Sequence, residues 1–408
     1  MKSSSIKIIR NSTIQPVKIS LPASKSIANR ALIIAALSGQ NSLINNLSEA
    51  RDTRTMQRLL GSDIPIWDVL DAGTTMRFLT ALSAVTQPRT LTGTTRMKER
   101  PIKILADALT TLGARIEYLE QEGYPPIAVG PIEDQLTKNI SVRGDISSQY
   151  ISALLMIAPV LPYGLEIELT GHIGSKPYIN TTLAVMRSYG VNAEWNDHII
   201  YIPQQRYIAK EYTVEPDWSA ASYWYSFVAL SESGEVLLED LPDNSIQGDR
   251  KIADYMKLLG VHTTFTPEGA LLTKCDHAPE VTFDFTDCPD MAQTVAVLCA
   301  AKGIKCTMSG LESLRIKETD RIYALQTELA KIGAELKEVN NEWLLTPVVG
   351  HWKEDIEFDT YHDHRMAMAF APLSALSTVI IHDPVVVDKS YPRYWEDMEK
   401  AGFTISEL

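Results

Sequence analysis

Six times along the chain, a short polar stretch is followed at once by a strongly apolar one. The apolar stretches have no polar face, which predicts helices buried in an interior rather than lying on a surface. From the second copy onward the polar stretches, called heads below, recur at intervals of roughly 72 residues, and such a period indicates repeated structural units. The heads are residues 24–26, 71–75, 145–149, 217–219, 287–290 and 362–365.

A second series of helical patterns alternates with the first. These patterns are amphipathic, and each ends at a glycine, the residue that most easily adopts the left-handed conformation after a helix. Short alternating stretches follow in most copies and predict strands. The closing glycines are Gly61, Gly113, Gly190, Gly260, Gly333 and Gly402. One unit is therefore a βαβαββ module of about 70 residues.

Six modules predict an α/β protein of two globular domains, each with three modules around buried parallel helices. An open solenoid of the same modules is the alternative, but a solenoid rarely buries one fully apolar helix per repeat. The first module is short, because only about 50 residues separate Lys25 from Gly73. We expect a trimmed sheet in that module, with both of its heads retained.

The heads are candidate anion sites, because unpaired N–H groups and the positive end of the helix dipole meet at a helix start. Lys25 and Ser26 begin one such helix, and Arg30 follows about one turn later. Gly73 opens another, where the missing side chain lets a ligand approach the backbone. Arg77 lies in the first turn of that helix. Capping and tight turns explain each motif when it is taken alone, but the repetition favours one anion-binding site.

Three further motifs carry groups that bind anions or hydroxyls. Arg96 and Arg100 precede Pro101, either in a rigid loop or on a solvated face. The Ser-Ser-Gln motif at residues 147–149 and the Ser-Lys-Pro-Tyr motif at residues 175–178 supply hydroxyl, amide and phenol groups. Simple helix capping is the alternative for both.

Charged motifs recur near the end of the chain. Lys317 and Arg321 are four residues apart and share one helical face, with Glu318 beside them; a surface charge array is the alternative. Arg365 begins an apolar helix, and Lys389 follows later.

Composition narrows the class of protein. The chain has 408 residues, 45% of them apolar, and a net charge of −13, which disfavours nucleic acid as a partner. Basic residues gathered in a few motifs of an acidic protein suit a small anionic substrate. No secretory signal and no apolar run long enough to span a bilayer are found, so we expect a cytoplasmic protein.

Metal and disulfide chemistry are disfavoured. Four cysteines without a CxxC pair predict free, buried thiols. The spacing of His362 and His364 would allow a metal, but an arginine follows immediately and no carboxylate cluster accompanies them.

Together these motifs resemble the 5-enolpyruvylshikimate-3-phosphate (EPSP) synthase family. The resemblance runs from about Leu21 to Pro392 and rests on eight ordered motifs. They are LPASKSIANRAL at 21–32, DAGTTMR at 71–77, RMKERPI at 96–102, SSQ at 147–149, SKPY at 175–178, KETDR at 317–321, DHRMAM at 363–368 and DKSYP at 388–392.

The resemblance implies two domains of three βαβαββ modules each, with the active site in the cleft between them. It places residues 1–18 and 216–408 in the first domain and residues 19–215 in the second. It also implies the activity: transfer of the enolpyruvyl group of phosphoenolpyruvate to the 5-hydroxyl of shikimate 3-phosphate, with release of phosphate. In this family the herbicide glyphosate occupies the phosphoenolpyruvate site.

The resemblance carries the family's binding residues onto matching positions of this chain. The implied shikimate 3-phosphate residues are Lys25, Ser26, Arg30, Ser147, Ser148, Gln149, Ser175, Tyr178, Asp290, Ser313 and Lys317. The implied phosphoenolpyruvate residues are Lys25, Gly73, Arg96, Gln149, Arg321, Arg365 and Lys389. Two positions depart from the family: Asp71 and Ser313 stand where many members have asparagine.

The residue types also fit the implied addition and elimination through a tetrahedral intermediate. Asp290 suits the base that removes the hydroxyl proton, while Glu318 and Lys25 both suit the acid that protonates phosphoenolpyruvate. Lys389 and Arg96 are available to stabilise the intermediate. The resemblance implies no metal or organic cofactor, and a monomer acting on small molecules without nucleic acid or membrane.

Two alternative functions make different demands on the sequence. The enolpyruvyl transferase that acts on UDP-N-acetylglucosamine usually carries a reactive cysteine in the loop that corresponds to residues 92–101, and this chain has none there. A catalytically silent anion-binding protein of the same fold would have lost Asp290, Glu318 or Lys25, and all three are present.

Overall fold

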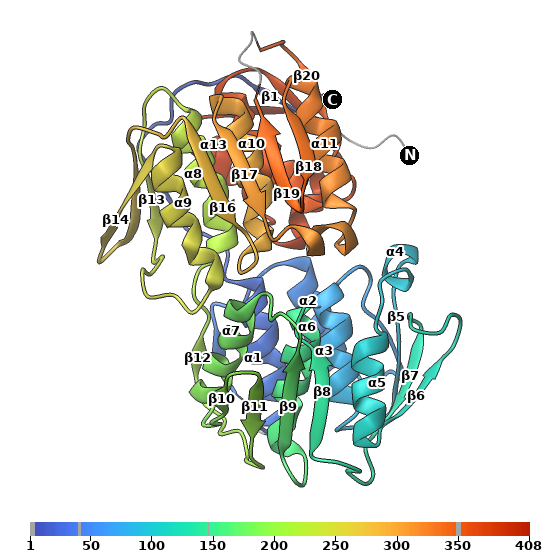
Figure 1. Cartoon of the computed structure of the whole chain (residues 1–408). Coiled ribbons are helices and arrows are strands. Elements are labelled where there is room, and N and C mark those ends of the chain that lie inside the picture. Colours follow the sequence, from blue (N-terminus) through green and yellow to red (C-terminus); the bar gives the residue numbers. More distant parts are fainter. Residues whose placement is uncertain (1–4, 40–41, 146, 348–351) are drawn as a thin grey trace. The chain divides into compact units, whose positions relative to one another are not determined.

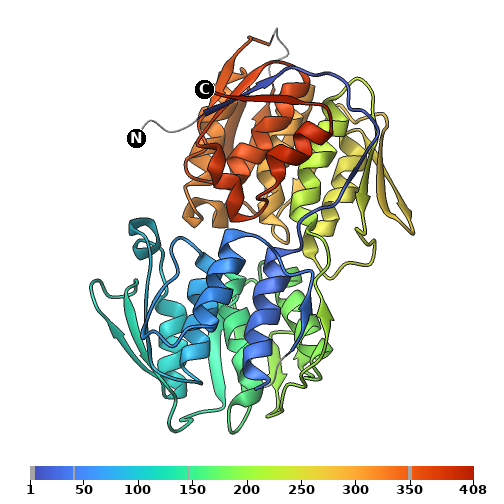
Figure 2. The same ribbon diagram turned by 180° about the vertical axis from the view of Figure 1, so that it is seen from behind.

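The computed structural model describes residues 5–39, 42–145, 147–347 and 352–408, which form two compact units (Figures 1 and 2). The first unit comprises Met1–Pro22 and Glu215–Leu408, and the second comprises Ala23–Val214. The sequence placed the first crossing after residue 18. The structure places it after Pro22, because strand β2 (Val17–Ile19) still pairs with β13 (Val236–Glu239) of the first unit.

One sheet topology is repeated five times in the described residues. In each four-stranded sheet the first two strands are parallel and the other neighbours are antiparallel. The second unit has two of these sheets. The first has the strand order β4 (Ile66–Asp68), β5 (Arg89–Thr92), β7 (Ile127–Gly130), β6 (Arg115–Tyr118). The second has the order β8 (Asn139–Arg143), β9 (Leu165–Thr170), β11 (Ile199–Ile202), β10 (Glu194–Asn196). In the first unit they are β2, β13, β15 (Gly269–Lys274), β14 (Val261–Thr266); β16 (Glu280–Asp284), β17 (Lys305–Ser309), β19 (Glu342–Thr346), β18 (Glu335–Val339); and β20 (Ile356–Phe358), β21 (Val379–His382), β1 (Ser5–Ile9), β22 (Thr404–Glu407).

The helices that follow the heads form the core of each unit, as predicted. In the second unit they are α1 (Lys25–Leu37), α3 (Gly73–Ser83) and α6 (Ser148–Ile157), and in the first unit α8 (Trp218–Leu230), α10 (Ala292–Lys302) and α12 (His364–Phe370). Within each unit the three pack against one another. In α8 every residue except Ser219 is buried. A helix without a polar face is stable only when it is enclosed in this way.

The second helix of each module lies outside and buries one face only. These helices are α2 (Arg51–Leu60), α5 (Lys103–Leu112) and α7 (Lys176–Ser188) in the second unit, and α9 (Ile252–Leu259), α11 (Arg321–Lys331) and α13 (Tyr394–Lys400) in the first. The remaining helical segments are the short α4 (Thr95–Lys98) and the 3₁₀ turns η1 (Ala158–Val160), η2 (Gly248–Lys251), η3 (Pro289–Met291), η4 (Glu312–Ile316), η5 (Ala371–Ala375) and η6 (Pro384–Lys389).

The two chain crossings exchange strands between modules. Strand β2 precedes α1 in the chain but pairs in parallel with β13, which follows α8. Conversely, β12 (Tyr212–Thr213) precedes α8 but pairs in parallel with β3 (Ile44–Asn45), which follows α1. The β3–β12 sheet has only two strands, which confirms the trimmed sheet predicted for the first module.

Two local expectations differ from the structure. Gly113, Gly190, Gly260, Gly333 and Gly402 have the positive φ angles expected of a glycine that ends a helix, but Gly61 has φ −84°. After α2 the chain runs on to β4 instead of reversing into a hairpin, so no left-handed residue is needed there. Of the four free cysteines, Cys275 is exposed rather than buried.

No helix among the described residues is long and apolar enough to cross a membrane.

The N-terminal strand β1 should be essential to the stability of the first unit, because it lies between β21 and β22. Ile8 is fully buried on this strand, while its neighbour Ile9 is 41% exposed. We predict that Ile8→Ala lowers the free energy of unfolding by about 2–5 kcal/mol and that the control Ile9→Ala lowers it by less than about 1 kcal/mol. Urea unfolding followed by tryptophan fluorescence measures both, and equal losses would contradict the central role of β1.

Candidate active site

Arg30 is the centre of a polar cluster in the core of the second unit. It is 2% exposed, and its guanidinium donates to Ser26 Oγ (2.7 Å), Ser152 Oγ (3.2 Å), Thr182 Oγ1 (2.7 Å) and the backbone oxygen of Tyr178 (3.2 Å). All of these partners are neutral. Burial lowers the pKa of Arg30 to about 10, as expected for a cation taken out of water without a counter-ion. An anion at Ser26 would supply the missing negative charge.

A second buried arginine lies against the glycine that opens α3. A Cβ atom built on Gly73 would be 2.5 Å from Arg100 Nη1 and 2.8 Å from its Nη2. Arg100 is 8% exposed, and among the described residues no carboxylate pairs with it. The absence of a side chain at Gly73 therefore makes room for a guanidinium.

Arg77 holds the Arg100 loop on the head of α3. Its Nη1 donates to the backbone oxygen of Gly73 (3.1 Å), and its Nη2 donates to that of Pro101 (3.0 Å). Tyr150 of α6 donates to the same Pro101 oxygen at 2.5 Å. The loop is thus tied to two of the three core helices.

The remaining predicted residues of this unit lie at the heads of α1, α6 and α7. Lys25 Nζ is 3.3 Å from Asp52 Oδ2 at the start of α2, and Gln149 Nε2 donates to Thr74 Oγ1 (3.1 Å), which joins the heads of α6 and α3. The hydroxyl-bearing residues are Ser147, which caps α6, Ser148 in its first turn, Ser175, which precedes α7 with φ 55°, and Tyr178 in the first turn of α7.

Arg96 differs from the other predicted cations. It lies on the short helix α4, its side chain is 44% exposed, and it pairs with Glu99 at 3.1 Å. The residue that lies against Gly73 is Arg100, four positions later in the same motif. The resemblance implied Arg96 as the phosphoenolpyruvate residue, and Arg100 was named only as part of the same motif. Spacing alone does not show which of the two arginines turns toward Gly73.

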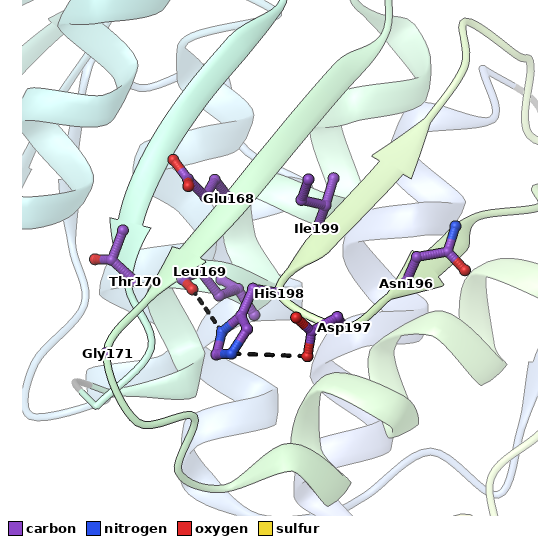
Figure 3. Close-up of a pocket in the computed structure, with 8 residues that line it drawn as sticks. All are labelled: Glu168, Leu169, Thr170, Gly171, Asn196, Asp197, His198 and Ile199. Carbon is purple, nitrogen blue, oxygen red and sulfur yellow. Dashed lines mark hydrogen bonds and ion pairs between the residues drawn. The ribbon is translucent and has the colours of Figure 1, made fainter.

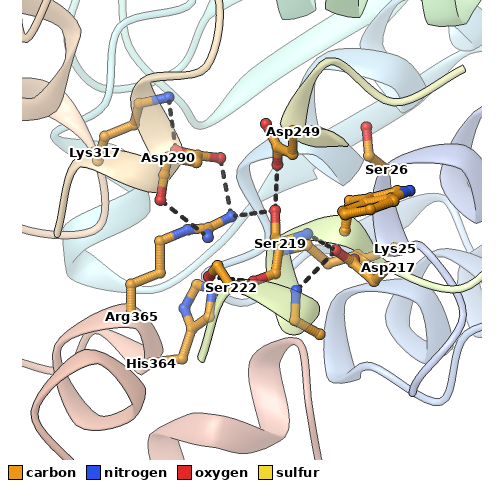
Figure 4. A network of polar contacts seen from close by, with 12 residues as sticks. Lys25, Ser26, Asp217, Ser219, Ser222, Asp249, Asp290, Lys317, His364 and Arg365 are labelled. Atoms are coloured by element: carbon orange, nitrogen blue, oxygen red, sulfur yellow. Dashed lines mark hydrogen bonds and ion pairs between the residues drawn. The ribbon is translucent and has the colours of Figure 1, made fainter. Parts of the chain in front are cut away.

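In the first unit, the carboxylate of Asp290 contacts three cations. Figure 4 shows two of them, Lys317 and Arg365. Asp290 lies in η3, directly before α10. Its Oδ1 is 2.9 Å from Arg321 Nη1 and 3.7 Å from Lys317 Nζ, and its Oδ2 is 3.0 Å from Arg365 Nη2. Burial by itself would raise the pKa of Asp290, but Arg365, Lys317 and Arg321 outweigh it and hold the pKa well below its usual range.

Arg321 joins three segments of the first unit. Besides Asp290, it contacts Asp363 Oδ2 through Nε (2.6 Å) and Glu318 Oε2 through Nη2 (2.9 Å), and it is 2% exposed. Burial alone would lower the pKa of Arg321, but the three carboxylates together raise it. Lys389 Nζ lies 4.0 Å from Glu318 Oε1, so both of these cations have carboxylate neighbours.

Local capping explains why these groups converge. Asp363 accepts from the backbone N–H of Arg365 (2.9 Å) as the N-cap of α12, and Asp320 caps α11 directly before Arg321. Ser313 lies on η4, the turn that leads to Lys317. Arg365 also contacts Ser219 Oγ at 3.4 Å, and the Ser219 hydroxyl donates to the buried Asp249.

A surface hollow outside both clusters contains none of the predicted site residues (Figure 3). It is lined by the end of β9 and the β10–β11 turn, including Glu168, Asp197 and His198. Two carboxylates make it unsuited to an anionic ligand. His362 and His364 do not converge either: the first side chain is 92% exposed beside Asp383, and the second is buried. Among the described residues, no His, Cys, Asp and Glu group is arranged to hold a metal.

Comparison with known proteins identifies the family. The family model of EPSP synthase (3-phosphoshikimate 1-carboxyvinyltransferase) matches residues 10–62 and 65–398. The chain belongs to the EPSP synthase family. The resemblance found in the sequence is thereby confirmed.

Curated relatives of this family are similar to the chain over nearly its whole length. The 3-phosphoshikimate 1-carboxyvinyltransferase of Bacteroides fragilis (strain YCH46) is 49% identical over 399 residues, covering 95% of each chain. That of Mannheimia haemolytica is 36% identical over 420 residues, covering 94% of this chain and 96% of the relative. The solved structure of EPSP synthase from Acinetobacter baumannii shares the fold, with a TM-score of 0.80 at 18% identity and full coverage of both chains.

Proposed function

We propose that this protein transfers the enolpyruvyl group of phosphoenolpyruvate to the 5-hydroxyl of shikimate 3-phosphate and releases phosphate. The observation that carries the proposal is the Arg100 guanidinium, buried against Gly73 without a carboxylate partner among the described residues. A buried cation of this kind is costly unless an anion completes it. Membership of the EPSP synthase family supports phosphoenolpyruvate as that anion.

The second unit supplies most of the substrate-binding groups in this proposal. Arg100, Lys25, Gly73 and Gln149 bind phosphoenolpyruvate, and Arg100 takes the role that the sequence had given to Arg96. Shikimate 3-phosphate is bound by hydroxyls and by the buried charge of Arg30, which polarises Ser26 through their 2.7 Å hydrogen bond. The hydroxyl donors assigned to it are Ser26, Ser147, Ser148, Ser175 and Tyr178.

The first unit supplies the base and the remaining cations. Asp290 removes the hydroxyl proton, Lys317 and Ser313 contact shikimate 3-phosphate, and the cations Arg321, Arg365 and Lys389 contact phosphoenolpyruvate. In the structure, Arg321, Arg365 and Lys317 contact the carboxylate of Asp290. We infer that incoming anions draw these cations away. The pKa of Asp290 then rises toward its usual range, which makes the carboxylate a better base.

The reaction proceeds by addition and elimination. As the 5-hydroxyl loses its proton to Asp290, its oxygen forms a bond to C2 of phosphoenolpyruvate, while C3 gains a proton from Glu318 or Lys25. The C2–O bond to phosphate then breaks, and phosphate leaves with the bonding electrons. C3 returns a proton to the group that had donated one, Glu318 or Lys25, which restores the double bond. The cations stabilise the negative charge that collects on the leaving phosphate.

We further propose that the protein works as a cytoplasmic monomer without a metal or organic cofactor. Its substrates are small anions rather than nucleic acid or membrane. The net charge of −13 disfavours nucleic acid as a partner.

The proposed reaction is tested directly by phosphate release. The wild-type protein should release phosphate from phosphoenolpyruvate when shikimate 3-phosphate is added, and not when UDP-N-acetylglucosamine is added instead. Glyphosate should inhibit this release in competition with phosphoenolpyruvate. Release with the UDP-sugar would favour the sister transferase, and ligand binding without release would favour a silent anion-binding protein.

Asp290→Asn should separate binding from chemistry. The amide keeps the shape of the side chain but cannot accept the hydroxyl proton, so we predict that kcat falls by about 10² or more. The KM for shikimate 3-phosphate should stay within about tenfold. Asp287→Asn, the same change three residues earlier, is the control and should keep its turnover. Near-normal kcat in Asp290→Asn would remove Asp290 from the role of base.

The two arginines of the RMKERP motif make a second matched pair. Because Arg100 lies against Gly73 while Arg96 pairs with Glu99, Arg100→Ala should raise the KM for phosphoenolpyruvate by about 10–100-fold. Arg96→Ala should change it by less than about threefold. Steady-state kinetics at saturating shikimate 3-phosphate measures both constants, and a larger effect at Arg96 would reverse the assignment.

A further inference from the structure

An ion pair connects the heads of α2 and α3, and neither of its residues is among the predicted site residues. Arg51, the first residue of α2, directs Nη2 at both carboxylate oxygens of Asp71, at 3.0 and 2.9 Å. Asp71 lies in the turn that precedes α3. The side chains are 41% and 30% exposed, so solvent screens the pair and its contribution to stability is small.

The pair matters for its position, because it lies close to Gly73 and to the partner of Lys25. Asp71 is two residues before Gly73, and consecutive Cα atoms are 3.8 Å apart, so the two Cα atoms lie within about 8 Å of each other. On the other side, Arg51 directly precedes Asp52, the partner of Lys25. Thr75 of α3 also donates to the backbone oxygen of Asp52 (3.2 Å). The pair therefore joins the start of α3, which carries Gly73, to the start of α2, where Asp52 contacts Lys25.

The turn that carries Asp71 is itself conformationally constrained. Leu70 adopts φ 56°, a conformation that is unfavourable for a residue with a large side chain. Its backbone oxygen accepts from the N–H of Thr94 (3.0 Å), at the start of the loop that carries Arg100. A charge on this turn is thus held at a fixed place relative to Gly73.

We propose that Arg51 and Asp71 form a charge-compensated pair that determines how strongly the head of α3 binds the anionic substrate. The carboxylate of Asp71 adds a negative charge beside a site for an anion, and the guanidinium of Arg51 offsets it. This inference rests on the proposed function, because it takes phosphoenolpyruvate as the ligand at Gly73. Both residues act through the field at the site, so they are positioning residues rather than catalytic ones.

The sign of each single substitution follows from Coulomb's law. Arg51→Met removes the cation and leaves the negative charge of Asp71 within about one Debye length of the ligand, so binding of a multiply charged anion weakens. Asp71→Asn removes the negative charge and leaves the positive one, so binding stays equal or becomes tighter. The double variant restores the balance of charge.

The experiment is a double-mutant cycle on the full-length protein, with steady-state kinetics at low salt. We expect Arg51→Met to raise the KM for phosphoenolpyruvate by about 3–10-fold with little change in kcat. Asp71→Asn should not raise this KM. The KM of the double variant should lie within about twofold of the wild-type value. At about 0.5 M salt the effect of Arg51→Met should shrink, because screening weakens the field. Arg54→Met is the matched control, since this exposed arginine of α2 donates to the backbone oxygen of Glu49 rather than to a carboxylate.

Three outcomes would overturn the proposal. If both single variants raise KM and the double variant is no better than the worse of them, the pair is only a mechanical link. If Arg54→Met has the same effect as Arg51→Met, the loss concerns the general charge of α2. If the Arg51→Met effect is independent of salt, the field does not cause it.

Failure of the proposed function is detected separately. Absence of phosphate release by the wild-type protein would refute the reaction. The wild type, the two single variants Arg51→Met and Asp71→Asn, and the double variant would then be compared by calorimetry with phosphoenolpyruvate alone as the probe. The order of affinities among them still tests the charge pair, and equal affinities would overturn it.

Discussion

The polar cluster of the first unit is organised around the buried guanidinium of Arg321. Arg321 is almost completely enclosed, and its guanidinium binds the carboxylates of Asp290, Glu318 and Asp363. These carboxylates come from the head of α10, the segment before α11 and the head of α12. Each of them would be costly to bury alone, and so would the guanidinium. The arrangement is stable because all four groups are present together, and it brings the ends of three segments to one place.

The buried arginines of the two units have different partners. In the first unit Arg321 and Arg365 contact carboxylates. In the second unit the partners of Arg30 among the described residues are neutral, and Arg100 lies against the backbone of Gly73. A cation that already has a carboxylate must exchange it for a substrate anion. A cation without one binds an anion at once. This difference supports the proposed function, in which Arg30 and Arg100 give up no carboxylate on binding substrate and Arg321 and Arg365 do.

The repeated module explains how one chain positions so many polar groups in a core. Each module buries one helix that has no polar face, and three such helices enclose one another. The polar heads lie at the starts of these helices, where N–H groups and the helix dipole favour anions. The exchange of β2 and β12 between modules completes the sheets at the two crossings and links the N-terminal segment firmly to the first unit.

The sequence by itself determined the modules, the buried helices, the trimmed first sheet and the family, because these depend on periodic patterns and ordered motifs that are local in the chain. It also pointed to the heads as places where charged side chains gather. Only the tertiary structure decided which of those side chains meet. Arg96 and Arg100 look alike in the sequence, yet a short helix turns the first toward solvent and Glu99, while contacts of Arg77 and Tyr150 hold the loop so that the second lies on Gly73. The pairing of Arg51 with Asp71, and of Arg321 with Asp363, joins residues 20 and 42 positions apart. Such partners are set by how helices pack, and no local pattern specifies that packing.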